Sequence, residues 1–141
     1  MKKILIVNSN YYREISNNLV LMAKKKLLDV KFDVSILNIP GAFEIPIAIR
    51  KNINKFDGFI ALGCVIKGQT PHFNLLCSSL FNSILNLSVT YNKPIGNGVI
   101  TALNLNQAKH RSKKNKHNKS NKGSEAANAV ISILKNGPKK S

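Results

Sequence analysis

The sequence has 141 residues, of which 43% are hydrophobic, and a formal net charge of +16 at pH 7. This length allows one sizeable core and is short for two ordinary domains, so we expect one compact domain. The positive charge by itself favours a polyanion partner. Lys is plentiful along the whole chain, however, and a bias in overall composition is an alternative explanation for much of the excess. No apolar stretch reaches the length of a transmembrane helix.

The amino-terminal segment and the cysteines indicate a soluble, cytoplasmic protein. Met1–Lys3 and the apolar run Ile4–Val7 resemble the start of a signal peptide, but Asn8 ends that run and no small-residue cleavage site follows. Cys64 and Cys77 are the two cysteines, and both lie among apolar residues. Buried free thiols are typical of a reducing compartment, so we expect no disulfide.

Short apolar runs rich in β-formers alternate with longer segments of helical period. This pattern predicts a parallel sheet with crossover helices on its faces. Pro46 agrees with the pattern because it falls in the first turn of a helix, where backbone N–H groups lack helical partners. The predicted strands cover residues 3–8, 32–38, 58–66 and 95–101, and the predicted helices cover residues 12–29, 43–52, 71–92 and 104–111, with a last helix after Gly123.

Two of these helices have local start signals. Thr70 is a good N-cap and Pro71 suits the first helical position, so the third helix is expected to begin there. Gly123 is expected to precede the last helix. The remaining assignments are a polar loop over residues 112–120, a domain over residues 1–136 and a frayed tail over residues 137–141.

Ligands bind open parallel sheets at the carboxyl ends of the strands, so the loops at that edge are the candidate site. Lys67–His72 follows the third predicted strand, contains Gly68 to allow a turn, and leads directly into a helix. Free N–H groups and the positive helix end would suit a phosphate, although many strand-to-helix turns look alike. His72 would lie in the first helical turn, where the dipole favours a neutral ring that can accept a proton. A capping or surface histidine is the alternative.

Two further loops carry candidate ligand contacts. Glu44, one of six acidic residues, lies between Pro40 and Pro46. Its carboxylate could cap backbone donors or accept hydrogen bonds from substrate hydroxyls. Tyr11 and Tyr12 follow the first predicted strand and could offer an aromatic face to a flat ligand or pack against the core.

Three motifs, in this order and at these separations, resemble those of lumazine synthases. They are Pro40–Pro46 (PGAFEIP), Gly63–Phe73 (GCVIKGQTPHF) and Asn121–Ala127 (NKGSEAA). The resemblance extends from Lys3 to Leu134. It implies a flavodoxin-like α/β fold, a three-layer sandwich with a four-stranded parallel sheet, and an active site between neighbouring subunits of a pentamer.

The resemblance also implies a reaction, the condensation of 5-amino-6-(D-ribitylamino)uracil with 3,4-dihydroxy-2-butanone 4-phosphate. The product is 6,7-dimethyl-8-ribityllumazine, formed in riboflavin biosynthesis with release of phosphate and water and without a cofactor or metal. The implied site residues are Tyr11, stacked on the pyrimidine; Ala42, Phe43 and Glu44, at the ribityl chain and ring; Cys64, Val65 and Ile66, at the pyrimidine; Gln69, Thr70 and Arg111, at the phosphate; His72, for proton transfer; and Asn97 and Lys122, near the ring.

The sequence departs from the family pattern at three places. Asn10–Tyr12 stands where an Arg-aromatic-Asn triplet is common, Asn97 replaces a frequent Phe, and Lys67 replaces a frequent Arg, which keeps the charge and loses the planar fork. A flavodoxin-like protein that binds a flavin or lumazine without catalysis therefore remains an alternative. A nucleic-acid-binding protein is another, although the basic segment 109–122 contains no aromatic residue for base stacking.

The expected assembly is a homopentamer, single or paired into a decamer, and not the hollow shell that many lumazine synthases form. The chain begins almost directly at the first predicted strand, whereas shell-forming members carry an amino-terminal extension. The connection from Arg111 to Asn121 is also longer than theirs. Two small-molecule substrates are the expected partners, with no specific nucleic acid and no membrane.

Overall fold

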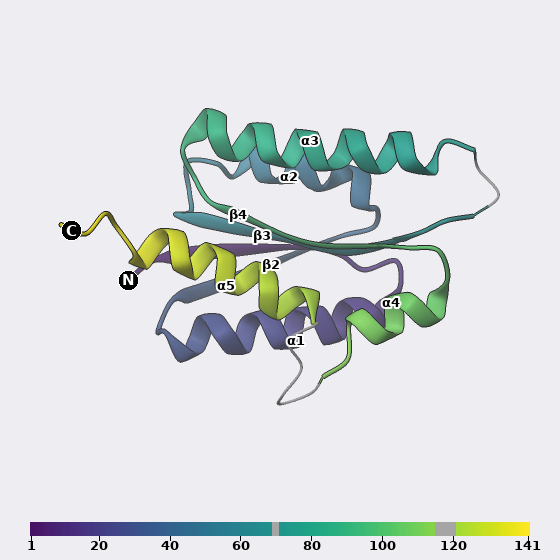
Figure 1. The fold of residues 1–141 in the computed structure, drawn as a ribbon, viewed down its shortest axis with the longest axis horizontal. Coiled ribbons are helices and arrows are strands. Elements are labelled where there is room, and N and C mark those ends of the chain that lie inside the picture. Colours follow the sequence, from purple (N-terminus) through teal and green to yellow (C-terminus); the bar gives the residue numbers. More distant parts are fainter. Residues whose placement is uncertain (69–70, 115–120) are drawn as a thin grey trace.

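A computed structural model describes residues 1–68, 71–114 and 121–141 (Figure 1). Its centre is a four-stranded sheet in the order β2-β1-β3-β4, with every neighbouring pair parallel. Helices cover both faces of this sheet. The α/β sandwich with a flavodoxin-like parallel sheet is therefore confirmed. Within the described residues, no helix is both long and apolar enough to cross a membrane.

The elements follow the predicted order, and most of their boundaries shift by only a residue or two. The second strand begins one residue later than expected because Phe32 turns into the core instead of pairing. The segment predicted as one helix over 43–52 is a 3-10 turn followed by a helix. The elements are β1 (Lys3–Ser9), α1 (Arg13–Asp29), β2 (Asp33–Ile39), η1 (Ala42–Glu44), α2 (Ile45–Lys51), β3 (Gly58–Ile66), α3 (Phe73–Tyr91), β4 (Ile95–Ala102), α4 (Leu105–Arg111) and α5 (Lys122–Lys135).

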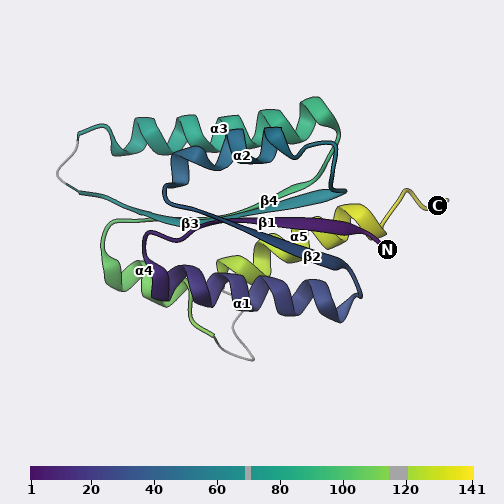
Figure 2. The same ribbon diagram turned by 180° about the vertical axis from the view of Figure 1, so that it is seen from behind.

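Helices α1, α4 and α5 cover one face of the sheet, and α2 and α3 cover the other (Figure 2). An apolar cluster on each face holds these layers together. The α1-side cluster lies under α1, α4 and α5 and includes Ile6, Leu62 and Ile100. The α2-side cluster lies under α2 and α3 and includes Val7 and Phe59. β1 and β3 contribute to both clusters because successive side chains of a strand point to opposite faces. Both strands consequently read as nearly continuous apolar runs.

The chain changes direction across the sheet at β1 and β3. The connection from β1 through α1 leads outward to β2, and the connection through α2 returns on the opposite face to β3 (Figure 1). Pairing of β1 with β3 ends at Asn8–Leu62, whereas pairing of β3 with β4 continues to Ile66–Ala102. Residues 63–66 therefore extend beyond the last residue paired with β1. This is the crevice where open α/β sheets bind ligands.

The predicted start of α3 is wrong. The helix begins at Phe73, with His72 as N-cap, so Pro71 lies in the preceding turn and His72 is outside the first helical turn. The backbone of His72 has φ −99° and ψ 12°, outside the helical region, while its carbonyl accepts the first helical hydrogen bond, from the N–H of Leu76 at 2.9 Å. Thr70, the predicted N-cap, lies outside the described residues.

The start of α5 also differs from the prediction, because Gly123 lies inside the helix. Asn121 is the N-cap: its Oδ1 accepts the N–H of Ser124 and its Nδ2 donates to the carbonyl of Lys113, both at 3.0 Å. A Cβ on Gly123 would collide with the backbone carbonyl of Leu19 in α1. Gly123 is thus required by the close packing of α5 on α1, and not by a turn.

This packing predicts the effect of Gly123→Ala. In an unconstrained helix the change would stabilise by about 1 kcal/mol, because Ala is the better helix former. Here the added methyl must separate α5 from α1, so we expect a net loss of about 1–3 kcal/mol in the free energy of unfolding. Urea denaturation of Gly123→Ala beside Gly137→Ala, where the added Cβ meets nothing within 4 Å, provides the measurement. Equal stability of the two variants would contradict the close packing.

Candidate functional site

The loop after β1 presents an aromatic ring to solvent at the carboxyl edge of the sheet. Tyr11 is 75% exposed, so the expectation that it could pack in the core is wrong. Tyr12 is half-buried against the α1-side cluster, and the two rings meet edge to face with centroids 4.9 Å apart. The contact with Tyr12 therefore supports the Tyr11 ring in its outward position. The exposed ring is free to stack on a flat heterocycle.

The 3-10 turn after β2 lies at the same edge. Ala42 is buried and anchors the turn in the α2-side cluster, which leaves Phe43 47% exposed and Glu44 exposed. Glu44 is the N-cap of α2, a helix that the structure describes in full, but its side chain makes no capping hydrogen bond there. The capping alternative is therefore wrong. Its carboxylate instead folds back against the Cα of Gly41. The turn thus presents one apolar ring and one hydrogen-bond acceptor.

The end of β3 presents backbone polar groups beside these two loops. Because β1 stops pairing at Leu62, the backbone of Cys64, Val65 and Ile66 lies beyond the β1 ladder and can bond a ligand on that side. The Cys64 side chain itself is buried, and this burial raises the pKa of its thiol to about 11. The thiol is therefore protonated at neutral pH and is a poor nucleophile.

Tyr12 and Cys64 are electrostatic neighbours. Burial raises the pKa of the Tyr12 hydroxyl, and the nearby Cys64 thiol and Tyr11 hydroxyl raise it further. Both groups are neutral near pH 7. The α1 side of the strand ends is consequently uncharged at this point, which suits an uncharged ring more than an ion.

The β3–α3 loop is described only at its two ends. The N–H of Lys67 donates to the carbonyl of Ala102 at 2.8 Å, which prolongs the β3–β4 ladder, and the Lys67 side chain is exposed. Gly68 does not adopt a positive φ, so the backbone at this described residue does not use the left-handed conformation that glycine permits. His72 is exposed at the start of α3. The predicted phosphate ligands Gln69 and Thr70 lie outside the described residues.

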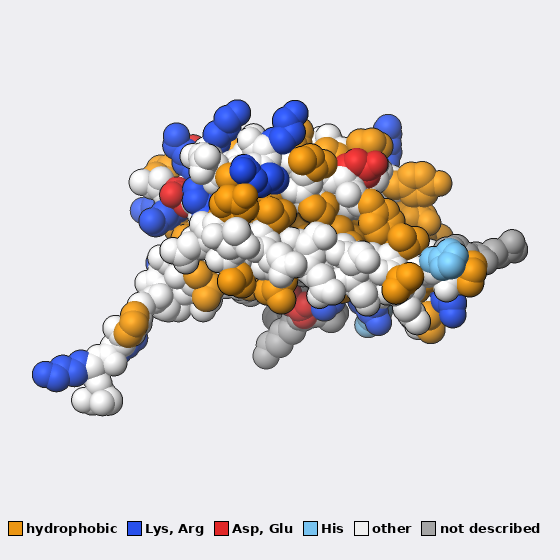
Figure 3. Space-filling model, turned by 90° about the horizontal axis from the view of Figure 1, so that it is seen from above, with side chains coloured by type: hydrophobic (Ala, Val, Ile, Leu, Met, Phe, Trp, Pro, Cys, Tyr) orange, Lys and Arg blue, Asp and Glu red, His pale blue; other side chains and the backbone are white. Residues whose placement is uncertain are grey.

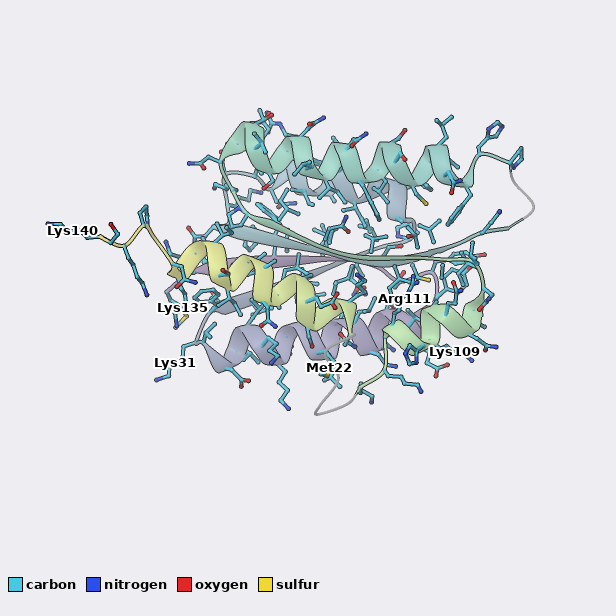
Figure 4. The ribbon with its side chains drawn as sticks, in the orientation of Figure 1. Met22, Lys31, Lys109, Arg111, Lys135 and Lys140 are labelled. Atoms are coloured by element: carbon cyan, nitrogen blue, oxygen red, sulfur yellow. The ribbon has the colours of Figure 1, made fainter. Side chains whose placement is uncertain are left out.

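Arg111 is the last residue of α4 and lies near the end of β4 (Figure 4). It is half-buried at the last turn of α4, and its Nη1 donates to the carbonyl of Thr101 at 2.7 Å. The start of α4 is fixed by two side chains, since Asn104 Oδ1 accepts the N–H of Gln107 and Gln107 Oε1 accepts the N–H of Leu103, both at 2.9 Å. The guanidinium thus lies at the carboxyl edge with further N–H donors available.

Asn104 and Gln107 were not among the residues predicted for the site. An Asn followed three residues later by Gln, just before a short apolar period, is a capping signal that the sequence does contain. It predicts a well-defined start of α4. The hydrogen bond from Arg111 to Thr101 had no such local signal, because it depends on how α4 packs on β4.

The structure does not bring Asn97 and Lys122 into this group. Asn97 is exposed in the middle of β4, opposite Ala61, and its Oδ1 accepts the N–H of Val99 at 3.0 Å. Lys122 begins α5, and its Nζ lies 3.2 Å from a carboxylate oxygen of Glu125. Asn97 thus bonds within its own strand, and Lys122 pairs within its own helix.

Two grooves among the described residues extend along α2, and one of them is lined by Glu44. A groove of about 670 Å³ runs between β2 and α2, and another of about 530 Å³ lies between α2 and α3. Neither is lined by Tyr11, His72 or Arg111. The carboxyl edge itself carries an aromatic ring, an acceptor, backbone groups and a cation.

Comparison with known proteins relates this arrangement to one family. A family model described as 6,7-dimethyl-8-ribityllumazine synthase matches residues 1–136. The chain is 36% identical over 135 residues to the 6,7-dimethyl-8-ribityllumazine synthase of Bartonella tribocorum, covering 94% of this chain and 89% of the relative. Identity to the protein of that name from Bartonella bacilliformis is 37% over 136 residues, covering 94% and 90%. For the Vesicomyosocius okutanii protein it is 36% over 121 residues, covering 79% and 72%. The chain therefore belongs to the 6,7-dimethyl-8-ribityllumazine synthase family.

Proposed function

We propose that this protein is a transferase that condenses 5-amino-6-(D-ribitylamino)uracil with 3,4-dihydroxy-2-butanone 4-phosphate to form 6,7-dimethyl-8-ribityllumazine. The observation that carries the proposal is the grouping of Tyr11, the η1 turn and the open end of β3 at the β1–β3 crevice of a chain in this family. The two unpaired thiols support a cytoplasmic location.

The pyrimidine substrate would bind across the β1–β3 crevice. Tyr11 offers a face for stacking, and the backbone of residues 64–66 offers donors and acceptors for the ring. Phe43 covers the ring or the chain, and the Glu44 carboxylate accepts hydrogen bonds from the ribityl hydroxyls. Ala42 fixes the position of this turn through its burial. The neutral Cys64 thiol has no covalent role in this scheme.

The ketone phosphate would bind on the other side of the β3 end, by the start of α3. Gln69 and Thr70 are proposed to donate to the phosphate, together with the positive end of α3. Arg111 is proposed as the cationic partner, and its anchor on the Thr101 carbonyl supports this role because it leaves less side-chain freedom to lose on binding.

The chemistry needs proton transfers but no redox step. The 5-amino group attacks the ketone and the imine forms with loss of water. Removal of a proton from the carbon next to the imine lets the C–O bond to phosphate on the following carbon break, and phosphate leaves. The enol that remains becomes a ketone. The ribityl-bearing nitrogen attacks that ketone, and the ring closes with loss of a second water. His72, exposed at the start of α3, is the group we assign to the proton transfers.

Assembly into pentamers, single or paired, is part of the proposal. Helix α3 contains no charged residue in its 19 residues, although the chain carries 22 Lys and Arg. Leu85 and Val89 on this helix are 61% and 74% exposed, and Figure 3 shows hydrophobic patches on this face. A charge-free helix with exposed apolar side chains indicates a covered surface. Asn97 and Arg111 would then lie opposite the strand-end loops of a neighbouring chain.

Replacement of His72 tests the proton-transfer role. His72→Ala is expected to lower kcat about 10²–10⁴-fold while leaving the affinity for the pyrimidine nearly unchanged, because a proton carrier acts on the barrier. His110→Ala is the matched control, since His110 is also exposed but lies on α4. Steady-state assays that follow lumazine absorbance give both constants. Unchanged kcat in His72→Ala would remove it from the mechanism, and no turnover in the unmodified protein would favour a non-catalytic binder.

Replacement of Arg111 tests the phosphate role. Arg111→Ala is expected to raise KM for the ketone phosphate about 10- to 100-fold, since a hydrogen bond to a charged group contributes about 1.5–3 kcal/mol, and to change KM for the pyrimidine little. Lys109→Ala, an exposed cation on the same helix, should change neither constant (Figure 4). Equal increases in both constants for Arg111→Ala would indicate a structural role instead.

Light scattering tests the assembly. The purified protein should have a mass near five or ten times the 15.6 kDa of one chain. A Leu85→Lys, Val89→Lys double variant should dissociate, because it places charges in an apolar contact. Leu21→Lys on α1, where the leucine is similarly exposed, should retain the assembly. Monomers in the unmodified protein, or a hollow shell, would contradict the proposal.

A further inference from the structure

Gly41 occupies a position where the backbone does not require glycine. It lies between β2 and η1 with φ −123° and ψ 151°, an extended conformation that other residues adopt freely. It is half-buried and is the N-cap of the 3-10 turn. The reason for a glycine must therefore lie in what surrounds its Cα.

The surroundings of Gly41 are the carboxyl group of Glu44. A Cβ built on Gly41 would collide with Glu44 Oε2 and would lie 3.3 Å from Cδ and 3.5 Å from Oε1. These are the three heavy atoms nearest to that Cβ. The N–H of Glu44 donates to the carbonyl of Gly41 at 3.3 Å, so the turn itself brings residue 44 back over residue 41. The space left by the missing side chain is filled by the carboxylate.

We propose that Gly41 is a positioning residue, whose missing side chain sets where the Glu44 carboxylate lies and hence how it meets the hydroxyl groups of the substrate. The inference rests on the proposed function, in which Glu44 accepts hydrogen bonds from the ribityl chain. Gly41 does not contact the substrate. The Glu44 side chain is exposed and could adopt several positions. The absence of a side chain at Gly41 allows the position in which the carboxylate folds back along η1.

This arrangement separates function from stability. A methyl group on Gly41 meets the far end of a flexible, exposed side chain and not the backbone, so the carboxylate moves and the turn stays. An alanine in an extended conformation also reduces the freedom of the unfolded chain relative to glycine. Gly41→Ala should therefore keep or raise the melting temperature while it displaces the acceptor.

The experiment compares Gly41→Ala with Gly137→Ala, in which the new methyl group meets nothing within 4 Å. Gly41→Ala is expected to raise KM for the ribityl-pyrimidine about tenfold, the effect of losing one hydrogen bond to a charged group. KM for the ketone phosphate should not rise, and the melting temperature should not fall. A lowered melting temperature would assign Gly41 to the fold and overturn the proposal, as would an unchanged KM for the pyrimidine.

Glu44→Ala and the double variant complete the test. If Gly41 acts through the carboxylate, Gly41→Ala should have no further effect once Glu44 is Ala, so the double variant should equal Glu44→Ala. A tenfold effect of Gly41→Ala that persists in the double variant would overturn the positioning role while leaving the role of Glu44 intact. If Glu44→Ala left KM for the pyrimidine unchanged, the role of Glu44 in the proposed function would fail, and with it the need to position its carboxylate.

Discussion

The parallel pairing of β1 with β3 is the constraint on which the rest of this protein depends. Both strands are buried from two sides, so each must supply apolar side chains to the α1 side and to the α2 side at once. Their pairing also ends early, at Asn8–Leu62, while β3 continues beside β4. The same pair therefore fixes the core and leaves the backbone of residues 64–66 open at one edge.

Much of this organisation could be predicted from the sequence, because it arises from local patterns. The nearly continuous apolar runs of β1 and β3 identify a buried parallel sheet, and Pro46 correctly marks the first turn of α2. The family motifs correctly predict the fold. What the local pattern could not provide are features set by packing between distant segments. Gly123 was expected to precede a helix, yet Asn121 caps α5 and Gly123 lies inside it, where the close α1 backbone at Leu19 leaves no room for a side chain.

The candidate site divides in the same way. The loop after β1 and the segment after β2 could be located from the sequence, since they follow strands. Whether Tyr11 faced core or solvent depended on how Tyr12 packs beneath it. Glu44 was predicted within one helix over residues 43–52, whereas it lies in the 3-10 turn η1, and the motif did not indicate the direction of its carboxylate. The anchor of Arg111 on Thr101 was likewise inaccessible, because it joins α4 to β4 through a side chain and a main-chain carbonyl.

The absence of charge along α3, a helix that the structure describes in full, has a consequence for temperature and ionic strength. Contacts through such a surface rest on apolar burial, which weakens on cooling because its driving force near room temperature is largely entropic. The rest of the chain carries all of the net charge of +16, so copies of the chain repel one another, and dissolved ions reduce that repulsion. The proposed association through α3 should therefore be favoured by warmth and by salt, and weakest in cold, dilute buffer.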